Sequence, residues 1–218
     1  MFNEALVTGA GGALGRVVVQ VLRQRGMCVH AVYHHEQAGE GGYHCDLSSA
    51  PEVQKLCEQV LANKRVAIVH CAGGFIWNKT ADYKTKDYDY LMSANFRSAF
   101  LLLRYALPLL RQQQAGGRIV FVSSAASLSP NANNIGMGVY SASKSALNAL
   151  LMSTCAEVRG EGININAICP TIIDTPRNRN DMPDADRSQW VSCEKIAQLI
   201  CVLLSKDGEL FHNCFIPM

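Results

Sequence analysis

A tyrosine and a lysine stand four residues apart at the start of a helical stretch, Tyr140-Ser141-Ala142-Ser143-Lys144. On an α-helix, residues i and i+4 lie one above the other, so the phenol and the ammonium can face one site. A tyrosine has a pKa of about 10, and a cation within roughly 4 to 6 Å lowers that pKa. The spacing therefore predicts a general acid/base that works near neutral pH. Such pairs also occur on ordinary helices, with the tyrosine in the core and the lysine in solvent.

A glycine-rich turn follows the first apolar run, Ala5-Leu6-Val7, and leads directly into a helical pattern. Strand, glycine turn and helix form the arrangement that binds a pyrophosphate at a helix amino terminus. Gly9 permits the tight turn, the next two glycines let backbone approach phosphate, and Gly15 lets the helix pack close to the strand. A flexible loop is the alternative interpretation. The expected cofactor-binding residues here are Thr8, Gly9, Gly11, Gly12, Ala13, Leu14 and Gly15.

The second predicted strand, Met27 to Val32, ends in Tyr33-His34-His35, where an NAD site normally places an acid for the adenosine ribose. No carboxylate stands there, and Arg16, just past the glycine turn, can meet a 2'-phosphate. Tyr33, His34 and Arg16 are therefore expected at the cofactor, and the pattern favours NADP over NAD. Adjacent histidines point apart on a strand, which argues against a metal site. Asp46 is expected to bond the adenine amino group or, alternatively, to cap a helix.

Strands and helices alternate along the chain. Residues 66–70, 119–122 and 163–169 are short apolar runs with helical patterns between them. Continuous apolarity is typical of parallel strands that helices cover on both faces. We therefore predict one α/β domain over residues 1–218, a doubly wound Rossmann-type, mostly parallel sheet with helices on both faces. With 218 residues, 49% of them apolar, the chain is long enough for one sizeable core and short for two.

Residues 174–190 show no periodicity and follow the carboxyl end of a strand, where long loops usually cover ligands. A solvated surface excursion is the alternative. The predicted substrate-loop residues are Arg177, Asn178, Arg179 and Trp190. Elsewhere, we expect a long helix from Asn95 to Leu110 after an irregular polar and aromatic segment, and a last strand from Phe211 to Ile216.

Composition points to a small-molecule partner. The 20 basic and 18 acidic residues give a net charge of +2 without a basic tract, so binding to nucleic acid or a membrane is not expected. The nine cysteines include no C-x-x-C pair, which favours reduced thiols in the cytoplasm over disulfides or a zinc site. The amino terminus lacks the basic region of a signal peptide, and the most apolar segment is too short to span a bilayer.

Taken together, these motifs resemble the short-chain dehydrogenase/reductase family over nearly the whole chain. The matching residues are Thr8-Gly9 to Gly15, Asp46-Leu47, Ala72-Gly73, Asn95, Ser123-Ser124, Tyr140 to Lys144 and Pro170 to Thr175. The resemblance implies an oxidoreductase that transfers hydride between NAD or NADP and a carbonyl, alcohol or C=N group. It also implies a homodimer or homotetramer, joined by helix faces that carry Leu102, Leu103, Leu147, Leu150 and Leu151. The alternative is that these leucines all pack inward.

The resemblance also assigns roles to individual residues. Tyr140 becomes the general acid/base, and Lys144 the partner that lowers its pKa and holds the nicotinamide ribose. Ser124 is expected to bond the substrate oxygen, and Asn95 to hold a water for proton relay. The remaining expected cofactor contacts are Leu47, Ala72, Gly73, Gly74, Pro170, Ile172, Ile173 and Thr175.

Three departures from the family pattern stand out. Ala13 occupies the position of the second motif glycine, which narrows the room for backbone. His70-Cys71 replaces an asparagine pair before Ala-Gly, which puts a strand-tethering contact in doubt. The spacing from Ser124 to Tyr140 is longer than usual, so Ser127 is a second candidate for the catalytic serine.

Within the family, residues 174–190, Gly11 to Gly15 and Ala72 to Gly74 are similar to the dihydropteridine reductases, which reduce quinonoid dihydropterin with NADH. Those enzymes as a rule carry an acid at the position of Tyr33 and lack a serine at that of Ser124. Quinonoid dihydropteridine reductase, with a pterin-like substrate, is therefore the alternative function. A non-catalytic NAD(P)-sensing protein is the alternative from another class, motivated by Ala13, His70 and the short carboxyl end.

Overall fold

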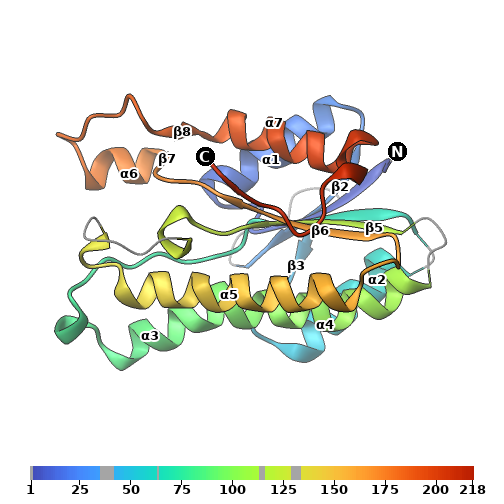
Figure 1. Ribbon diagram of the computed structural model, residues 1–218, viewed down its shortest axis with the longest axis horizontal. Coiled ribbons are helices and arrows are strands. Elements are labelled where there is room, and N and C mark those ends of the chain that lie inside the picture. Colours follow the sequence, from blue (N-terminus) through green and yellow to red (C-terminus); the bar gives the residue numbers. More distant parts are fainter. Residues whose placement is uncertain (1, 35–41, 63, 113–115, 129–133) are drawn as a thin grey trace.

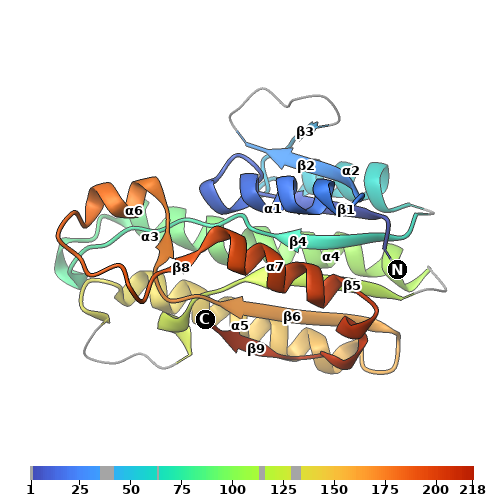
Figure 2. The same ribbon diagram turned by 90° about the horizontal axis from the view of Figure 1, so that it is seen from above.

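Seven parallel strands form the centre of the fold (Figure 2). In spatial order they are β3 (Gly42–His44), β2 (Cys28–Tyr33), β1 (Glu4–Thr8), β4 (Val66–His70), β5 (Gly117–Val122), β6 (Ile163–Cys169) and β9 (Phe215–Pro217). Their pairings are all parallel, which confirms the predicted fold class. β4 and β5 are buried along their whole length, so their sequences are apolar runs without alternation.

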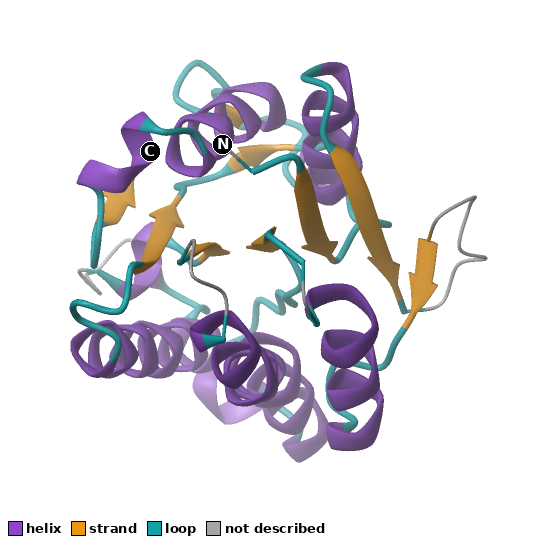
Figure 3. Ribbon diagram, turned by 90° about the vertical axis from the view of Figure 1, so that its right-hand side faces the viewer, coloured by secondary structure: helices purple, strands orange, loops and turns teal. Residues whose placement is uncertain are grey.

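Helices cover both faces of this sheet (Figures 1 and 3). α1 (Ala13–Gln24) and α7 (Cys193–Leu204) pack on one face, above the sheet in Figure 1. α2 (Ala50–Leu61), α4 (Ser98–Arg111) and α5 (Gly138–Glu157) pack on the other. Each face has its own buried apolar cluster, so the sheet lies between two cores, as in doubly wound folds.

The computed structural model describes residues 2–34, 42–62, 64–112, 116–128 and 134–218. His35, which the sequence places at the end of the second strand, lies outside the described residues. Within them, no helix is long and apolar enough to cross a membrane.

The structure differs from the sequence expectations at three segments. The irregular segment before Asn95 contains a helix, α3 (Thr85–Met92), which continues through a π-helical turn (Ser93–Arg97) into α4. The 174–190 loop contains a short helix, α6 (Pro176–Asp181), between β7 (Ile173–Asp174) and β8 (Val191–Ser192), which pair with each other. The last strand is Phe215–Pro217 rather than Phe211 to Ile216, because residues 207–210 form a 3-10 turn and the chain then bends.

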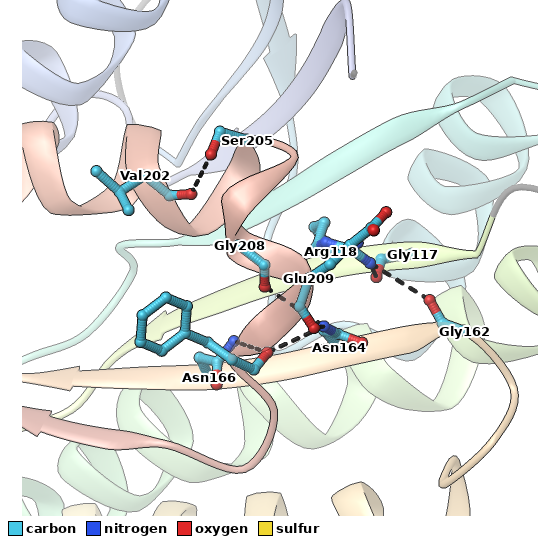
Figure 4. A network of polar contacts seen from close by, with 10 residues as sticks. Gly117, Arg118, Gly162, Asn164, Asn166, Val202, Ser205, Gly208 and Glu209 are labelled. Atoms are coloured by element: carbon cyan, nitrogen blue, oxygen red, sulfur yellow. Dashed lines mark hydrogen bonds and ion pairs between the residues drawn. The ribbon is translucent and has the colours of Figure 1, made fainter.

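A polar network at the amino-terminal end of the sheet fixes this last segment (Figure 4). Asn164 on β6 donates from its amide nitrogen to the carbonyl oxygens of Glu209 and Phe211, at 2.9 and 3.0 Å. Arg118 on β5 is 5% exposed and forms an ion pair with Glu209 at 3.1 Å. The Asn164 bonds satisfy two backbone carbonyls outside the strands, and together with the ion pair they hold the segment that leads into β9.

His70 supplies the strand-tethering contact that its departure from the family pattern put in doubt. Its Nδ1 accepts a hydrogen bond from the Thr8 hydroxyl at 2.9 Å, and its Nε2 donates to the Ser98 hydroxyl at 3.2 Å. The Ser98 hydroxyl donates its single proton to the carbonyl oxygen of Ala94 at 2.7 Å. It can therefore only accept from the His70 Nε2, which places the ring proton on Nε2 and leaves Nδ1 as an acceptor. One neutral imidazole therefore ties β1, β4 and α4 together.

The leucines that were expected to join subunits are packed inside the single chain. Leu102, Leu103, Leu147 and Leu151 are buried in the core beneath α4 and α5, and Leu150 packs against the same cluster. The alternative, that they face inward, is therefore correct, because both helices need a broad apolar face to cover the sheet. Phe100 and Met152 are the large apolar side chains that these two helices expose instead.

The burial of His70 predicts a loss of stability in acid. Complete burial lowers the pKa of His70 to about 3, from 6.5. Between those two pH values the unfolded chain holds a proton that the folded chain does not, so stability falls as the pH drops from 6.5. We expect the free energy of unfolding in urea to fall between pH 7 and pH 4.5, and to fall by about 2–3 kcal/mol more in the wild type than in His70→Asn.

The exposed histidine of β3 provides the control for this measurement. His44→Asn should keep the pH dependence of the wild type. If the free energy of unfolding of His70→Asn fell between pH 7 and pH 4.5 by as much as that of the wild type, the role of His70 would be contradicted.

Candidate active site

The glycine turn packs against the end of β4 with no room for a side chain. Gly9 has a φ of +68°, and a Cβ there would lie 2.6 Å from the backbone nitrogen of Ala72. A Cβ on Gly15 would lie 2.1 Å from the carbonyl oxygen of Gly9. Ala13, by contrast, is exposed at the first position of α1, so the departure there leaves the turn intact.

The same turn exposes a helix amino terminus suited to an anion. Gly12 is the N-cap of α1 and has no side chain to occupy the first amides, while its own N–H donates to the Gly9 carbonyl at 3.0 Å. Free helix amides and the helix dipole attract phosphate, so the turn fits a pyrophosphate. The side chains of Thr8 and Leu14 point elsewhere, since Thr8 bonds His70 and Leu14 lies in the core.

A cavity of about 340 Å³ lies beside this turn, at the end of β2. It is lined by Ala10, Arg16, Val19, Gln20, Arg23, Gln24 and Tyr33. Among the described residues, no carboxylate lines it, whereas two guanidinium groups do. The Arg16 Nε donates to the carbonyl oxygen of Gly11 at 2.8 Å, which holds that side chain at the turn. The cavity is therefore electropositive and next to the predicted adenosine end of the cofactor site.

His34 and Asp46 meet on the other side of the β2 end. The His34 Nε2 lies 3.6 Å from an Asp46 carboxylate oxygen, and both side chains are about half exposed, at 54% and 41%. The same carboxylate oxygen accepts from the backbone nitrogen and the hydroxyl of Ser48, at 2.8 and 2.7 Å. Asp46 thus stabilises the turn before α2, whose N-cap is Ser49. The neighbouring Leu47 packs on the core.

Tyr140, Ser124 and Lys144 come together at the carboxyl ends of β5 and β6. The Ser124 side chain hydrogen-bonds the side chain of Tyr140. The ring of Phe75 packs edge-on against the Tyr140 ring, with centroids 4.9 Å apart. Burial raises the pKa of Tyr140 above its usual value of 10.0, while the hydrogen bond from Ser124 acts in the opposite direction. The phenol is therefore protonated at neutral pH.

Lys144 is fully enclosed and held by one carbonyl. It is 5% exposed, and its Nζ donates to the backbone oxygen of Val122 at 2.9 Å. Burial lowers the pKa of Lys144 from 10.5 to about 8. The sequence predicts that this lysine lowers the pKa of Tyr140, but the pKa of Tyr140 is raised, because desolvation of the phenol is the larger effect.

Asn95 links its own helical turn to the loop that follows β4. It lies in the π-helical turn, a local feature frequent at functional sites. Its side chain exchanges two hydrogen bonds with the backbone of Gly74, at 2.8 and 3.0 Å. It also donates to the Ser143 hydroxyl at 3.0 Å, which itself donates to the Tyr140 carbonyl at 2.7 Å. The π-turn therefore positions the helix that carries Tyr140.

The backbone of Gly73 packs closely against two of the predicted catalytic residues. A Cβ at this position would lie 2.8 Å from the Asn95 side-chain oxygen and 3.2 Å from the Lys144 Nζ. Gly73 itself is exposed, whereas Asn95 is 1% and Lys144 is 5% exposed, so a residue with a side chain would not fit at this position without displacing one of these two groups.

Ser127 belongs to a structural network rather than to the Tyr140 site. Its hydroxyl donates to the Ser124 carbonyl at 2.6 Å and accepts from the Asn148 amide at 2.9 Å. The Asn148 side-chain oxygen accepts from the Ser123 hydroxyl at 2.6 Å. Asn148 was not singled out from the sequence, although its position four residues after Lys144 places both on one face of α5. It holds the loop that presents Ser124.

The segment after β6 closes the other side of the site. The Pro170 carbonyl accepts from the backbone nitrogen of Ala125 at 2.9 Å, which joins the segment to the Ser124 loop. Ile172 is 39% exposed, whereas Ile173 packs on the core. The Thr175 hydroxyl caps α6 by accepting from the Asn178 backbone nitrogen.

The predicted substrate-loop side chains make contacts within their own loop. Arg179 forms two hydrogen bonds with the Asp174 carboxylate, at 2.6 and 2.7 Å. Asn178 donates from its amide to the Ile173 carbonyl at 2.8 Å, and Arg177 pairs with Asp181 at 3.5 Å. The Trp190 ring lies 5.6 Å from the Arg187 guanidinium. These contacts give the loop a defined shape over the carboxyl end of the sheet (Figure 1).

The sequence and the fold of this chain resemble those of known proteins. A family model described as short chain dehydrogenase matches residues 3–186. A tropinone reductase homologue of Arabidopsis thaliana is 37% identical over 188 residues, which covers 79% of this chain and 68% of the relative. The 2,3-dihydro-2,3-dihydroxybenzoate dehydrogenase of Escherichia coli is 31% identical over 199 residues, covering 89% and 75%. A short-chain type dehydrogenase/reductase from Mycobacterium ulcerans superposes with a TM-score of 0.89 at 21% identity, covering 99% and 88%.

The buried ammonium of Lys144 should reduce the stability of the fold at neutral pH. The lowered pKa, from 10.5 to about 8, means that the buried charge destabilises the folded state by about 3 kcal/mol at pH 7. Lys144→Met removes this charge, but it also leaves the Val122 carbonyl without its hydrogen bond, which costs about 1 kcal/mol of folding stability. Chemical denaturation at pH 7 should therefore show Lys144→Met to be about 2 kcal/mol more stable than the wild type.

The pH dependence of protein stability tests whether the buried charge of Lys144 is the cause. Between pH 8 and 10.5 the lysine is protonated in the unfolded wild type but not in the folded wild type, so the stability of the wild type rises with pH. The stability difference between Lys144→Met and the wild type should therefore shrink over this range. Lys195→Met, at an exposed lysine, is the control and should stay within 0.5 kcal/mol of the wild type, as surface substitutions usually do. A Lys144→Met protein less stable than the wild type at pH 7 would contradict the expectation.

Proposed function

Because this chain belongs to the short-chain dehydrogenase/reductase family and is an NAD(P)-dependent oxidoreductase, we propose that it interconverts a carbonyl or C=N group and its reduced form, with Tyr140 as general acid/base. The hydrogen bond between Ser124 and Tyr140, with the enclosed Lys144 behind them, carries this proposal. A phenol and a hydroxyl that are hydrogen-bonded to each other, with an ammonium nearby, form a set of groups that can bind and protonate a substrate oxygen.

The protein residues would position the substrate and move one proton. Bound NAD(P) supplies or accepts the hydride at its nicotinamide. In reduction, Tyr140 donates its phenolic proton to the substrate oxygen, and Ser124 donates a hydrogen bond to the same oxygen. Lys144, fixed by the Val122 carbonyl, stabilises the phenolate that remains. In oxidation, the same phenolate would take the proton back.

The predicted cofactor-binding residues would hold the rest of the dinucleotide. The glycine turn and the first amides of α1 would bind the pyrophosphate. Lys144 would hold the nicotinamide ribose, and the Pro170 to Thr175 segment would cover the carboxamide side. Asp46, Leu47 and Ala72 would border the adenine.

Replacement of Tyr140 tests the mechanism. Tyr140→Phe should lower kcat by about 10²- to 10⁴-fold, because a positioned general acid contributes that much. NADPH binding should stay within about twofold, since the ring and its packing on Phe75 remain. Steady-state rates on a panel of ketones and imines, together with quinonoid dihydropterin, would measure the effect and identify the substrate class.

Two variants refine this test. Tyr88→Phe, at an exposed tyrosine, should keep full activity and serves as the control. Ser124→Ala should lose more activity than Ser127→Ala, because the Ser124 side chain bonds Tyr140 and the Ser127 side chain bonds the loop. Full turnover by Tyr140→Phe on an identified substrate would overturn the mechanism.

A pterin-like substrate remains a second proposal within the same chemistry. It is supported by the sequence of residues 174–190, which the structure orders into α6 and the β7–β8 pair over the site. Turnover of quinonoid dihydropterin in the assay above would support it, and no turnover with either cofactor would reject it.

For the cofactor we propose NADP rather than NAD. Arg16 and Arg23 line the cavity beside Tyr33, and none of its lining residues in the described part of the chain carries a carboxylate that would repel a 2'-phosphate. Fluorescence titration should give a Kd for NADPH at least about tenfold below that for NADH, as expected for one charge-assisted contact of about 1.5 kcal/mol. Arg16→Ala and Arg23→Ala should weaken NADPH binding and leave NADH binding unchanged.

Arg25→Ala, at the exposed C-cap of α1, is the control for the cofactor titration and should bind both cofactors as the wild type does. Equal affinities of the wild type for the two cofactors would refute the NADP proposal.

We also propose a homodimer or homotetramer that works in the cytoplasm. All nine cysteines are free thiols, which suits a reducing compartment. The exposed Phe100 of α4 and Met152 of α5 are apolar side chains that a subunit contact would bury. Sedimentation velocity should show an oligomer that Phe100→Glu/Met152→Glu dissociates, whereas a wild-type monomer at micromolar concentration would reject the proposal.

A further inference from the structure

A cluster of three different metal-ligating side chains lies at the opposite end of the sheet from Tyr140. Glu4 opens β1, and Cys28 and His30 lie on the neighbouring β2. Their ligand atoms, one from each residue, all lie within 4.8 Å of one another. Among the described residues this is the one group of histidine, cysteine and carboxylate side chains gathered so closely. None of the three takes part in the reaction proposed above.

The pairing of the strands brings these side chains together. Glu4 and Cys28 are direct partners in the parallel register of β1 and β2, so both side chains point to the same face. Cys28 and His30 are two residues apart on one strand and therefore share that face as well. The cluster is thus a product of backbone geometry and does not depend on a chance meeting of long side chains.

We propose that Glu4, Cys28 and His30 form a zinc-binding site with an open fourth position. Zinc accepts sulfur, imidazole nitrogen and carboxylate oxygen together, whereas calcium and magnesium avoid thiolates. A tetrahedral zinc ion with bonds of about 2.0 to 2.3 Å separates its ligand atoms by roughly 3.3 to 3.8 Å. That span fits inside the 4.8 Å limit of the cluster. Water or a small exogenous ligand would complete the coordination.

Small adjustments accommodate the ion. The His30 Nε2 and a Glu4 carboxylate oxygen now lie 2.7 Å apart in a hydrogen bond, so they must separate by roughly 0.6 Å. The Glu4 side chain is 33% exposed and Cys28 is also exposed, so both have room to move. His30, whose side chain is 11% exposed, provides the fixed ligand.

The surroundings of His30 suit a metal ligand. Its Nδ1 lies 3.4 Å from the Tyr43 hydroxyl on β3, and the two rings are 5.8 Å apart between centroids. A ligating histidine usually bonds a neighbouring group through its second nitrogen, which fixes the tautomer and the ring orientation. A thiolate and a carboxylate also balance the charge of Zn²⁺, so the partly buried complex would carry no net charge.

The site is remote from the proposed chemistry. Glu4 precedes Thr8 by four residues along β1, which amounts to about 13 Å of extended strand. A metal ion there would join the amino-terminal ends of β1 and β2 and would not touch the substrate. Binding, rather than turnover, is therefore the appropriate measurement.

Cobalt is a spectroscopic probe for this site. The reduced, metal-free full-length protein is titrated with Co²⁺, and Zn²⁺ is then added in competition. The wild type should bind one Co²⁺ per chain with a near-ultraviolet thiolate-to-cobalt charge-transfer band, which Zn²⁺ abolishes. Cys28→Ser should lose the band, and its Zn²⁺ affinity, measured against a chelating dye, should fall by at least about 100-fold because one of three ligands is gone.

Further variants separate this site from the other cysteines. Cys214→Ser, at another partly exposed thiol, should keep the band and the affinity. Glu4→Gln should weaken Zn²⁺ binding, and Tyr43→Phe should weaken it by about tenfold, as loss of a supporting contact does. A wild type without the band, or a Cys28→Ser protein that keeps the band and binds Zn²⁺ within twofold of the wild type, would overturn the proposal.

Discussion

A buried ammonium held by a single carbonyl oxygen is the interaction around which the site is arranged. Lys144 donates to Val122 at the end of β5, inside a region that burial makes unfavourable for charge. Such a group lowers the stability of a fold unless an anion or a polar ligand reaches it. The exposed Gly73 lies directly beside this ammonium, since a Cβ on it would come within 3.2 Å of the Lys144 Nζ. A ligand that binds there can therefore recover free energy that the empty protein has lost, which is a common basis of pre-organised sites.

Two polar networks keep this arrangement rigid. His70 ties two strands and a helix below the glycine turn, and Asn148 ties α5 to the loop of Ser124. Both use buried, hydrogen-bonded side chains, which specify one geometry more strictly than apolar packing does. A histidine stands at position 70 where the family pattern has an asparagine, and its two ring nitrogens span the gap between Thr8 and Ser98.

The two ends of the sheet have different tasks. At the carboxyl ends, loops after β1, β4, β5 and β6 gather the residues proposed for cofactor and substrate, as expected for parallel sheets. At the amino ends, Arg118 and Glu209 fix the last strand, and Glu4, Cys28 and His30 form the cluster proposed for zinc. Chemistry at one end therefore tolerates change at the other, because about 13 Å of buried strand separates them.

The sequence by itself determined the parallel sheet, the glycine turn and the tyrosine–lysine pair, because strand burial, turn geometry and helix spacing are local properties. It missed α3, whose polar and aromatic residues show little periodicity. Only the tertiary structure decided that Ser124 rather than Ser127 meets Tyr140, since that depends on how a loop folds between two strands. The raised pKa of Tyr140 likewise depends on burial, and the zinc cluster on the register of two strands, neither of which spacing along the chain can specify.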